Sequence, residues 1–88
     1  MKKIEFEFED LSLQNRIQFD YDEEVDEELK VVIENGMPVL YANKQAYMAL
    51  AKIFVKMALG EYSDGFHIHL RQDFDGDKQE AMRCHLVS

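Results

Sequence analysis

Apolar and polar residues alternate along two stretches near the beginning of the chain. In residues 4–9 an isoleucine and two phenylalanines alternate with glutamates, and residues 16–21 repeat the alternation. A period of two is typical of a β-strand that buries one face. Residues 10–15 between the two stretches are mostly polar and suit a turn. The pattern therefore predicts an N-terminal hairpin with an acidic side that faces water.

A second hairpin is predicted near the middle of the chain. Residues 29–34 are rich in β-branched side chains, and Asn35 and Gly36 follow them. The Asn-Gly dipeptide tolerates the positive φ angles of a two-residue hairpin turn, so we expect residues 37–42 to form the returning strand. Pro38 cannot donate a ladder hydrogen bond, which places it at the strand start or on an open edge.

The next segment has the period of an α-helix from Asn43 to about Leu59. The Asn43 side chain can accept hydrogen bonds from the exposed amides of the first turn, and Gly60 can close the helix in the left-handed conformation. One apolar stripe is expected to pack on the sheet. The stripe consists of Tyr47, Leu50, Ala51, Phe54, Met57 and Ala58, and the lysines outside it are Lys44, Lys52 and Lys56.

Two histidines one residue apart lie in the run G-F-H-I-H-L, which begins a third predicted hairpin. Apolar residues alternate with His67 and His69, so a strand here places both imidazoles on its polar face. The loop D-F-D-G-D then reverses the chain into a last strand. If the apolar sides of both strands face one core, His67 pairs with His85 and Ile68 pairs with Cys84. All three histidines of the chain would then share one face.

These elements predict an α+β fold in a single domain that spans residues 1–88. About six strands are expected to form one antiparallel sheet, with the one long helix on one face, because an amphipathic helix shields only one side. A chain of 88 residues has room for one hydrophobic core. The uncovered face of the sheet is expected to carry His67, His69, Arg71, Arg83 and His85.

Acidic residues outnumber basic ones. There are 18 Asp and Glu against 10 Lys and Arg, which gives a formal net charge of −8. This balance disfavours direct binding to nucleic-acid phosphates or anionic membranes and suits a protein partner with a basic surface. Cys84 is the only cysteine, and no N-terminal apolar run has the length of a signal peptide or a membrane span. We therefore expect a cytoplasmic protein without an internal disulfide.

The densest acidic segment is D-E-E-V-D-E-E at residues 22–28. A run of like charges is usually a solvated loop. We hypothesise that this run, together with the glutamates of residues 4–9, forms the surface that meets a basic partner. The candidate partner-binding residues are Asp22, Glu23, Glu24, Asp26, Glu27, Glu28, His67 and His69.

The histidines also suggest a metal-binding alternative, because zinc can be held by two strand residues at i and i+2 and a third from a neighbouring strand. This alternative is a small zinc-binding module that uses His67, His69 and His85. The sequence offers no further ligand nearby, and the D-F-D-G-D loop lacks the twelve-residue calcium pattern. Phosphate-binding loop and nucleophile-elbow motifs are absent from the sequence. We therefore expect no catalytic residue, no metal and no cofactor.

The run V-L-Y-A-N-K-Q-A-Y-M-A-L-A-K-I-F-V-K-M-A-L-G, followed by G-F-H-I-H-L, resembles a family of small predicted immunity proteins from bacterial polymorphic toxin systems. In that family a helix begins after an asparagine and precedes a G-x-H-x-H-L strand. The resemblance spans residues 39–70 and is carried by Asn43, Gly65, His67, His69 and Leu70. It implies a non-catalytic protein that neutralises a cognate toxin by direct binding.

Two other functions remain open from the sequence. The acidic composition also suits a phage-type nucleic-acid mimic or inhibitor, and the histidines leave the zinc-binding module as a different class of function. A second copy of the chain is a further candidate partner for the uncovered sheet face, so a homodimer is possible.

Overall fold

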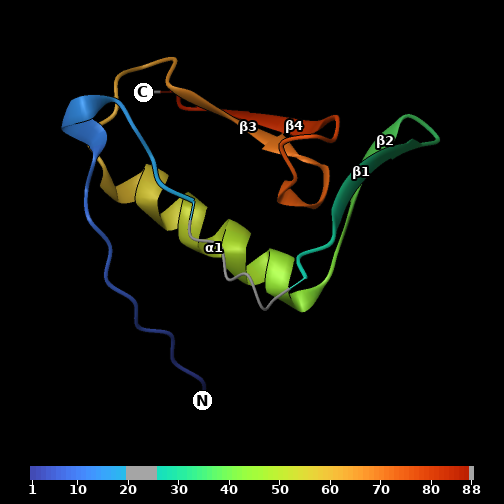
Figure 1. Cartoon of the computed structure of the whole chain (residues 1–88), viewed down its shortest axis with the longest axis horizontal. Helices are drawn as coiled ribbons and strands as arrows, with labels where there is room; N and C mark the ends of the chain where they lie inside the picture. Colours follow the sequence, from blue (N-terminus) through green and yellow to red (C-terminus); the bar gives the residue numbers. More distant parts are fainter. Residues whose placement is uncertain (20–25, 88) are drawn as a thin grey trace.

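The computed structural model describes residues 1–19 and 26–87, which contain one α-helix and four β-strands. The strands form two separate two-stranded antiparallel sheets, so the fold belongs to the α+β class. In Figure 1 the β3–β4 sheet lies along one side of the helix, and the β1–β2 hairpin projects from the N-terminal end of the helix. The elements are η1 (Ser12–Gln14), β1 (Leu29–Glu34), β2 (Met37–Ala42), α1 (Lys44–Leu59), β3 (His67–Arg71), η2 (Gln72–Phe74) and β4 (Glu80–His85).

The β1–β2 hairpin forms as its turn sequence predicts. Asn35 and Gly36 have φ angles of 52° and 78°, the two left-handed residues that a tight hairpin turn requires. Glu34 therefore pairs with Met37, and Pro38 stands opposite Ile33 near the start of β2. The placement of Pro38 agrees with the expectation that it lies near a strand start.

Helix α1 begins as predicted but ends differently. The Asn43 side chain accepts a hydrogen bond from the backbone N–H of Ala46 at 2.9 Å, which confirms the N-cap. Gly60 has φ −76° and ψ 162°, so the predicted left-handed closure is wrong. A Cβ at Gly60 would stand 2.5 Å from Cε2 of Tyr62, so the glycine is needed for this close approach rather than for its φ angle.

The buried stripe of α1 is rotated around the helix relative to the predicted one and shares only Leu50 and Met57 with it. Its apolar members Ala46, Leu50, Ile53 and Met57 pack with Leu29 of β1 and with Ile68 and Leu70 of β3. Two-stranded sheets cover only a thin strip of a helix, which leaves part of the predicted stripe in water. Tyr47, Ala51, Phe54 and Ala58 are exposed, whereas Lys56 is buried. The Lys56 Nζ donates a hydrogen bond to the carbonyl oxygen of Gln18 at 2.8 Å, which satisfies its charge in part.

The β3–β4 hairpin confirms the predicted register. His67 pairs with His85, and Ile68 pairs with Cys84. Ile68 and Leu70 point into the core, and His67 and His69 are exposed on the opposite face. The two-residue period of the strand therefore fixes which side chains reach the surface.

The predicted six-stranded sheet is wrong. Residues 4–9 form no strand, and 3-10 helix η1 occupies the segment expected to be a simple turn. In the second predicted strand, residues 16–19 are also irregular, while residues 20 and 21 lie outside the described residues. The alternating phenylalanines instead lie near α1, with the Lys52 Nζ 5.9 Å from the Phe6 ring centre and the Lys56 Nζ 6.0 Å from that of Phe8. A helix can cover the apolar side of these residues, and their backbone then needs no partner strand.

Candidate functional site

Acidic side chains from two distant segments meet at the base of the β1–β2 hairpin. A surface hollow of about 330 Å³ is lined by Asp26, Glu27 and Glu28, by Asp73 and Asp75 of the D-F-D-G-D loop, and by Lys78. We call these five carboxylates the acidic cluster. The sequence predicted its first three members as partner-binding residues. The other predicted acidic candidates, Asp22, Glu23 and Glu24, lie outside the described residues.

Asn43 holds one half of the acidic cluster against the start of α1. Its Oδ1 accepts hydrogen bonds from the N–H groups of Ala46 and, at 3.1 Å, of Glu28. Its Nδ2 donates to the carbonyl oxygen of Asp26 at 2.7 Å, and its own N–H donates to the Glu28 carbonyl. Residues 26–28 therefore lie near the positive end of the helix dipole, which stabilises negative charge.

Asp73 holds the other half of the acidic cluster, the D-F-D-G-D loop, against the start of β1. Its Oδ1 accepts a hydrogen bond from the Leu29 N–H and its Oδ2 accepts one from the Lys78 Nζ, both at 2.7 Å. The hydrogen bond from Lys78, followed by that from Leu29, lowers the pKa of Asp73 below its ordinary value. Asp73 and Phe74 both have left-handed φ angles, 53° and 54°, so these contacts fasten an uncommon backbone conformation.

The members of the cluster from the D-F-D-G-D loop were missed by sequence reasoning. The sequence predicts this loop only as a turn that lacks the calcium-binding pattern. Its proximity to residues 26–28 depends on the hydrogen bond between Asp73 and Leu29, which joins residues 44 positions apart. No local pattern specifies a contact of that kind.

The hairpin exposes apolar side chains at its turn end, and Tyr41 lies nearer the acidic cluster at its base. Ile33 is 66% exposed, Met37 63% and Tyr41 45%. Tyr41 also lines a second hollow of about 480 Å³ that shares Glu28 and Asp73 with the acidic one. The Tyr41 hydroxyl donates a hydrogen bond to the Glu34 carboxylate, and this bond raises the Tyr41 pKa. The base of the hairpin thus places the half-exposed Tyr41 ring beside carboxylates.

The three histidines gather on the outer face of the β3–β4 sheet, as the predicted register requires. The ring centres of His67 and His85 are 4.7 Å apart in a stacked pair, and those of His67 and His69 are 5.0 Å apart. The His69 Nδ1 lies 3.2 Å from Oε1 of Glu80, and the His67 Nδ1 lies 3.2 Å from the carbonyl oxygen of Gly65. Within residues 1–19 and 26–87, no group of three His, Cys, Asp or Glu is placed to hold a metal ion.

Glu80 was also missed by sequence reasoning. Its carboxylate accepts hydrogen bonds from Nε and Nη2 of Arg83, at 2.8 and 3.2 Å. The Arg83 bonds, helped by His69, lower the Glu80 pKa from 4.5 to about 2. Residues three apart on a regular strand point to opposite faces, but a register shift between Leu70 and Arg71 disturbs the ladder here. An irregularity of this kind leaves no signal in the hydrophobic pattern.

The low pKa of Glu80 predicts a pH-dependent contribution to stability. Because the folded chain favours the charged carboxylate, this contribution is present above about pH 4.5 and is lost as the pH falls toward about 2. We expect Glu80→Gln to lower the Tm at neutral pH, and the difference from the unmodified chain to shrink across that window. Thermal unfolding followed by circular dichroism measures it, with Glu5→Gln as a control that removes a charge from the N-terminal segment. A difference in Tm that stays constant down to pH 2 would contradict the prediction.

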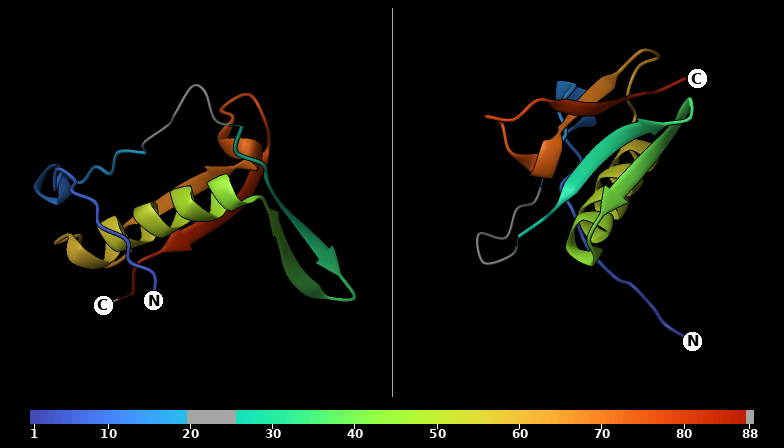
Figure 2. Two further views of the ribbon diagram at one scale, coloured as in Figure 1. Left: turned by 90° about the horizontal axis from the view of Figure 1, so that it is seen from below. Right: turned by 90° about the vertical axis from the view of Figure 1, so that its right-hand side faces the viewer.

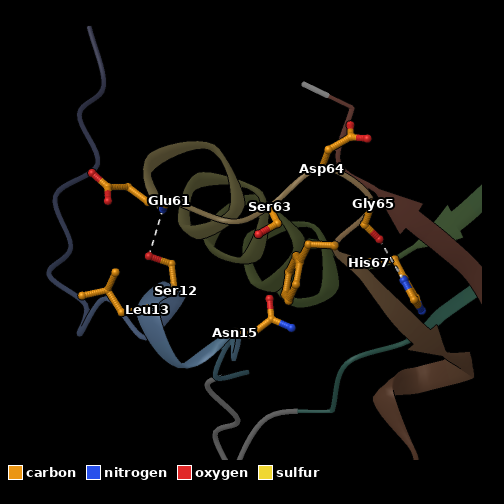
Figure 3. A pocket seen from close by; sticks show the side chains of 9 residues that line it. Ser12, Leu13, Asn15, Glu61, Ser63, Asp64, Gly65 and His67 are labelled. Atoms are coloured by element: carbon orange, nitrogen blue, oxygen red, sulfur yellow. Dashed lines mark hydrogen bonds between the residues drawn. The ribbon is translucent and has the colours of Figure 1, made fainter.

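A third hollow, of about 680 Å³, lies between η1 and the loop that precedes β3. Figure 3 shows Ser12 and His67 on opposite sides of it, with Ser63 and Asn15 between them. The Ser12 hydroxyl accepts a hydrogen bond from the Glu61 N–H at 2.9 Å. A nucleophile and its general base must be in hydrogen-bond contact. Ser12 and His67 lie on opposite sides of the hollow, so they do not form such a pair in this arrangement.

Comparison with protein-family models, with curated proteins and with solved structures found no match. In the described part of the chain, no helix has the length and apolar character needed to cross a membrane.

Proposed function

We propose that the chain is a non-catalytic binding protein for a basic protein partner, and specifically an immunity protein that neutralises a cognate bacterial toxin. The observation that supports binding is the junction of the acidic cluster with the exposed apolar side chains of the hairpin. The resemblance of residues 39–70 to small immunity proteins supplies the narrower role.

The junction has the composition of a protein interface. Tyr and Met are enriched where proteins meet, and an interface core depends on apolar contacts surrounded by polar groups. Tyr41 provides such a contact beside the acidic cluster, and Met37 continues the exposed apolar surface along the same face of the hairpin toward its turn. Opposite charge on a partner raises the rate of encounter and helps to select that partner.

The acidic cluster is held in place before any partner arrives. Asn43 and Asp73 fix its two segments by hydrogen bonds to the backbone. Little ordering of these segments is then needed on binding, which lowers the entropic cost of association. The glutamates of residues 4–9 are not part of this arrangement, because they belong to the N-terminal segment near Lys52 and Lys56 (Figure 2).

The proposal predicts that charge at the cluster controls the rate of association. The variant Asp26→Asn/Glu27→Gln/Glu28→Gln should bind the basic partner, once a pull-down from the source cell has identified it, about tenfold more slowly at low salt and with a weaker salt dependence. Surface plasmon resonance at several salt concentrations measures both effects. A matched control, Glu5→Gln/Glu7→Gln/Glu9→Gln, removes the same charge from the N-terminal segment and should slow association less.

Equal slowing by both triple variants would assign the effect to net charge rather than to the cluster. An unchanged rate in the cluster variant would exclude this surface as the contact and direct the search to the histidine face. Binding of the chain to many unrelated nucleic-acid-binding proteins would favour the nucleic-acid mimic instead.

A further inference from the structure

Helix α1 has a second apolar face, on the side opposite its buried stripe, which we call the open face. A helix turns by about 100° per residue, so the open face and the buried stripe are centred roughly half a turn apart. A helix that is apolar around most of its circumference is normally buried, so an exposed face of this kind indicates an interaction surface. All residues of the open face are exposed, the large ones from 37% at Val55 to 50% at Tyr47. They are Tyr47, Met48, Ala51, Phe54, Val55 and Ala58.

The N-terminal segment lies against a different side of α1. The Lys52 Nζ is 5.9 Å from the Phe6 ring centre, and the Lys56 Nζ is 6.0 Å from that of Phe8. Around the helix, both lysines stand between the open face and the apolar part of the buried stripe. The segment therefore borders the open face and leaves it accessible.

The centre of the open face has the spacing of a coiled coil. Tyr47, Ala51, Phe54 and Ala58 are separated by steps of four, three and four residues. Such spacing keeps an apolar seam directed toward a partner helix. The two aromatic residues are seven positions apart, and so are the two alanines. Large and small side chains therefore alternate along the seam.

A second copy of α1 in antiparallel orientation fits this alternation. With the two-fold axis midway between residues 52 and 53, Phe54 of each copy lies opposite Ala51 of the other, and Tyr47 lies opposite Ala58. Every layer then contains one large and one small side chain, which fills the space between the helices evenly. A parallel pair would place rings opposite rings and alanines opposite alanines, so overfilled layers would alternate with voids. Moving the antiparallel register by one heptad pairs only two of the four positions with each other.

Charge favours the same arrangement. The chain has a net charge of −8, but α1 contains three lysines and no Asp or Glu, so two copies repel each other least along this helix. Lys44 is the first residue of α1, where the helix dipole disfavours a cation, and the first turn has no acidic residue. In the antiparallel pair, Lys44 of one copy lies beside the C-terminal end of the other α1. The carbonyl groups of that end, and Glu61 that follows it, attract a positive charge.

We propose that the chain forms a homodimer in which the open faces of two α1 helices pack against each other in antiparallel orientation. The dimer is isologous, since the same residues of both copies form it, and the spacing predicts a helix crossing angle of about 20°. The second copy is thus assigned to α1 and not to the uncovered sheet face that the sequence suggested. The inference goes beyond the binding of a basic partner and does not depend on it, because no member of the acidic cluster lies on α1.

A charge placed in the centre of the open face tests the proposal. The unmodified chain should have twice its monomer mass of 10.4 kDa by sedimentation equilibrium. Ala51→Glu should raise the dissociation constant of the dimer about tenfold or more, because it brings two carboxylates into the apolar contact. The matched control is Gln45→Glu, which adds the same charge at an exposed position of α1 outside the open face. This control should change the dissociation constant by less than about twofold.

Lys44→Glu separates pairing from folding. In the monomer, a carboxylate in the first helical turn suits the helix dipole, so thermal unfolding at a concentration where the chain is monomeric should show no loss of stability. In the dimer, the same carboxylate faces the negative end of the other helix, so the dissociation constant should rise about threefold or more. A variant that is merely misfolded would lose stability and pairing together.

An exchange of large and small side chains tests the register. Phe54→Ala leaves alanine opposite alanine in two layers, and Ala51→Phe places two rings in each of them, so each change should weaken the dimer about tenfold. The double variant Ala51→Phe/Phe54→Ala restores one ring and one alanine in each layer and should dimerise like the unmodified chain. An equimolar mixture of the two single variants should form mixed dimers for the same reason.

Three results would overturn the proposal. The first is an unmodified chain that stays monomeric at millimolar concentration. The second is a dimer that Ala51→Glu leaves intact, because the contact must then lie elsewhere. The third is a double variant that pairs no better than its two single variants, which would contradict the antiparallel register.

Discussion

Leu70→Ala is expected to lower the free energy of unfolding by about 2–5 kcal/mol. Leu70 has 0% exposure and is one of the two largest fully buried side chains, together with Leu29. It belongs to the cluster in which β3 meets α1. Truncation removes its buried apolar atoms and leaves a cavity that a domain of this size can fill only in part. Urea denaturation followed by circular dichroism gives the change.

The matched control is Leu59→Ala. Leu59 is the last residue of α1 and is 68% exposed, so the same change of side chain should alter the free energy of unfolding by no more than about 0.5 kcal/mol. If the two variants lose similar amounts of stability, the packing of β3 on α1 is not the main source of stability.

Asn43→Ala is expected to cost about 1–2 kcal/mol, the upper part of the range for loss of an N-cap. The variant removes the acceptor for the Ala46 N–H and the side-chain hydrogen bonds to the backbone of Asp26 and Glu28. It should therefore weaken the start of α1 and also release Asp26 and Glu28. Thermal unfolding measures the first effect, and amide exchange at Glu28 measures the second.

Asn43→Ser separates the two roles. Serine caps a helix about as well as asparagine but has no amide group to donate to the Asp26 carbonyl. Its stability should stay near that of the unmodified chain, while exchange at Glu28 increases. A serine variant as unstable as the alanine variant would show that the link to the acidic segment, rather than the cap, stabilises the fold.

Features set by neighbouring residues were predictable. The Asn35-Gly36 turn, the Asn43 cap and the pairing of His67 with His85 each follow from a local rule about φ angles, capping or side-chain parity. These rules act within one hairpin or one helix turn. The features that they predict therefore do not depend on contacts with the rest of the chain.

Features that depend on distant segments were not predictable. The alternation in residues 4–9 requires that one side be covered, but it does not say whether a strand or a helix provides the cover. Lys56 was expected on an exposed face because it is charged, yet its Nζ reaches the Gln18 carbonyl from a buried position. Long aliphatic stems allow lysines to do this. The candidate site divides in the same way: its 26–28 half was visible in the sequence, and the Asp73 half was not.

The two separate sheets have a consequence for how the chain folds. Each sheet pairs strands that follow one another directly, joined by the turn at Asn35 and Gly36 or by residues 72–79. Forming either one therefore closes only a short loop, and α1 needs no distant segment for its own hydrogen bonds. Contacts between segments that are close in sequence form faster than those between distant segments. We therefore expect the long-range joins, such as Leu29 with Asp73 and Glu61 with Ser12, to form late, so that the acidic cluster is completed only when the preformed pieces dock.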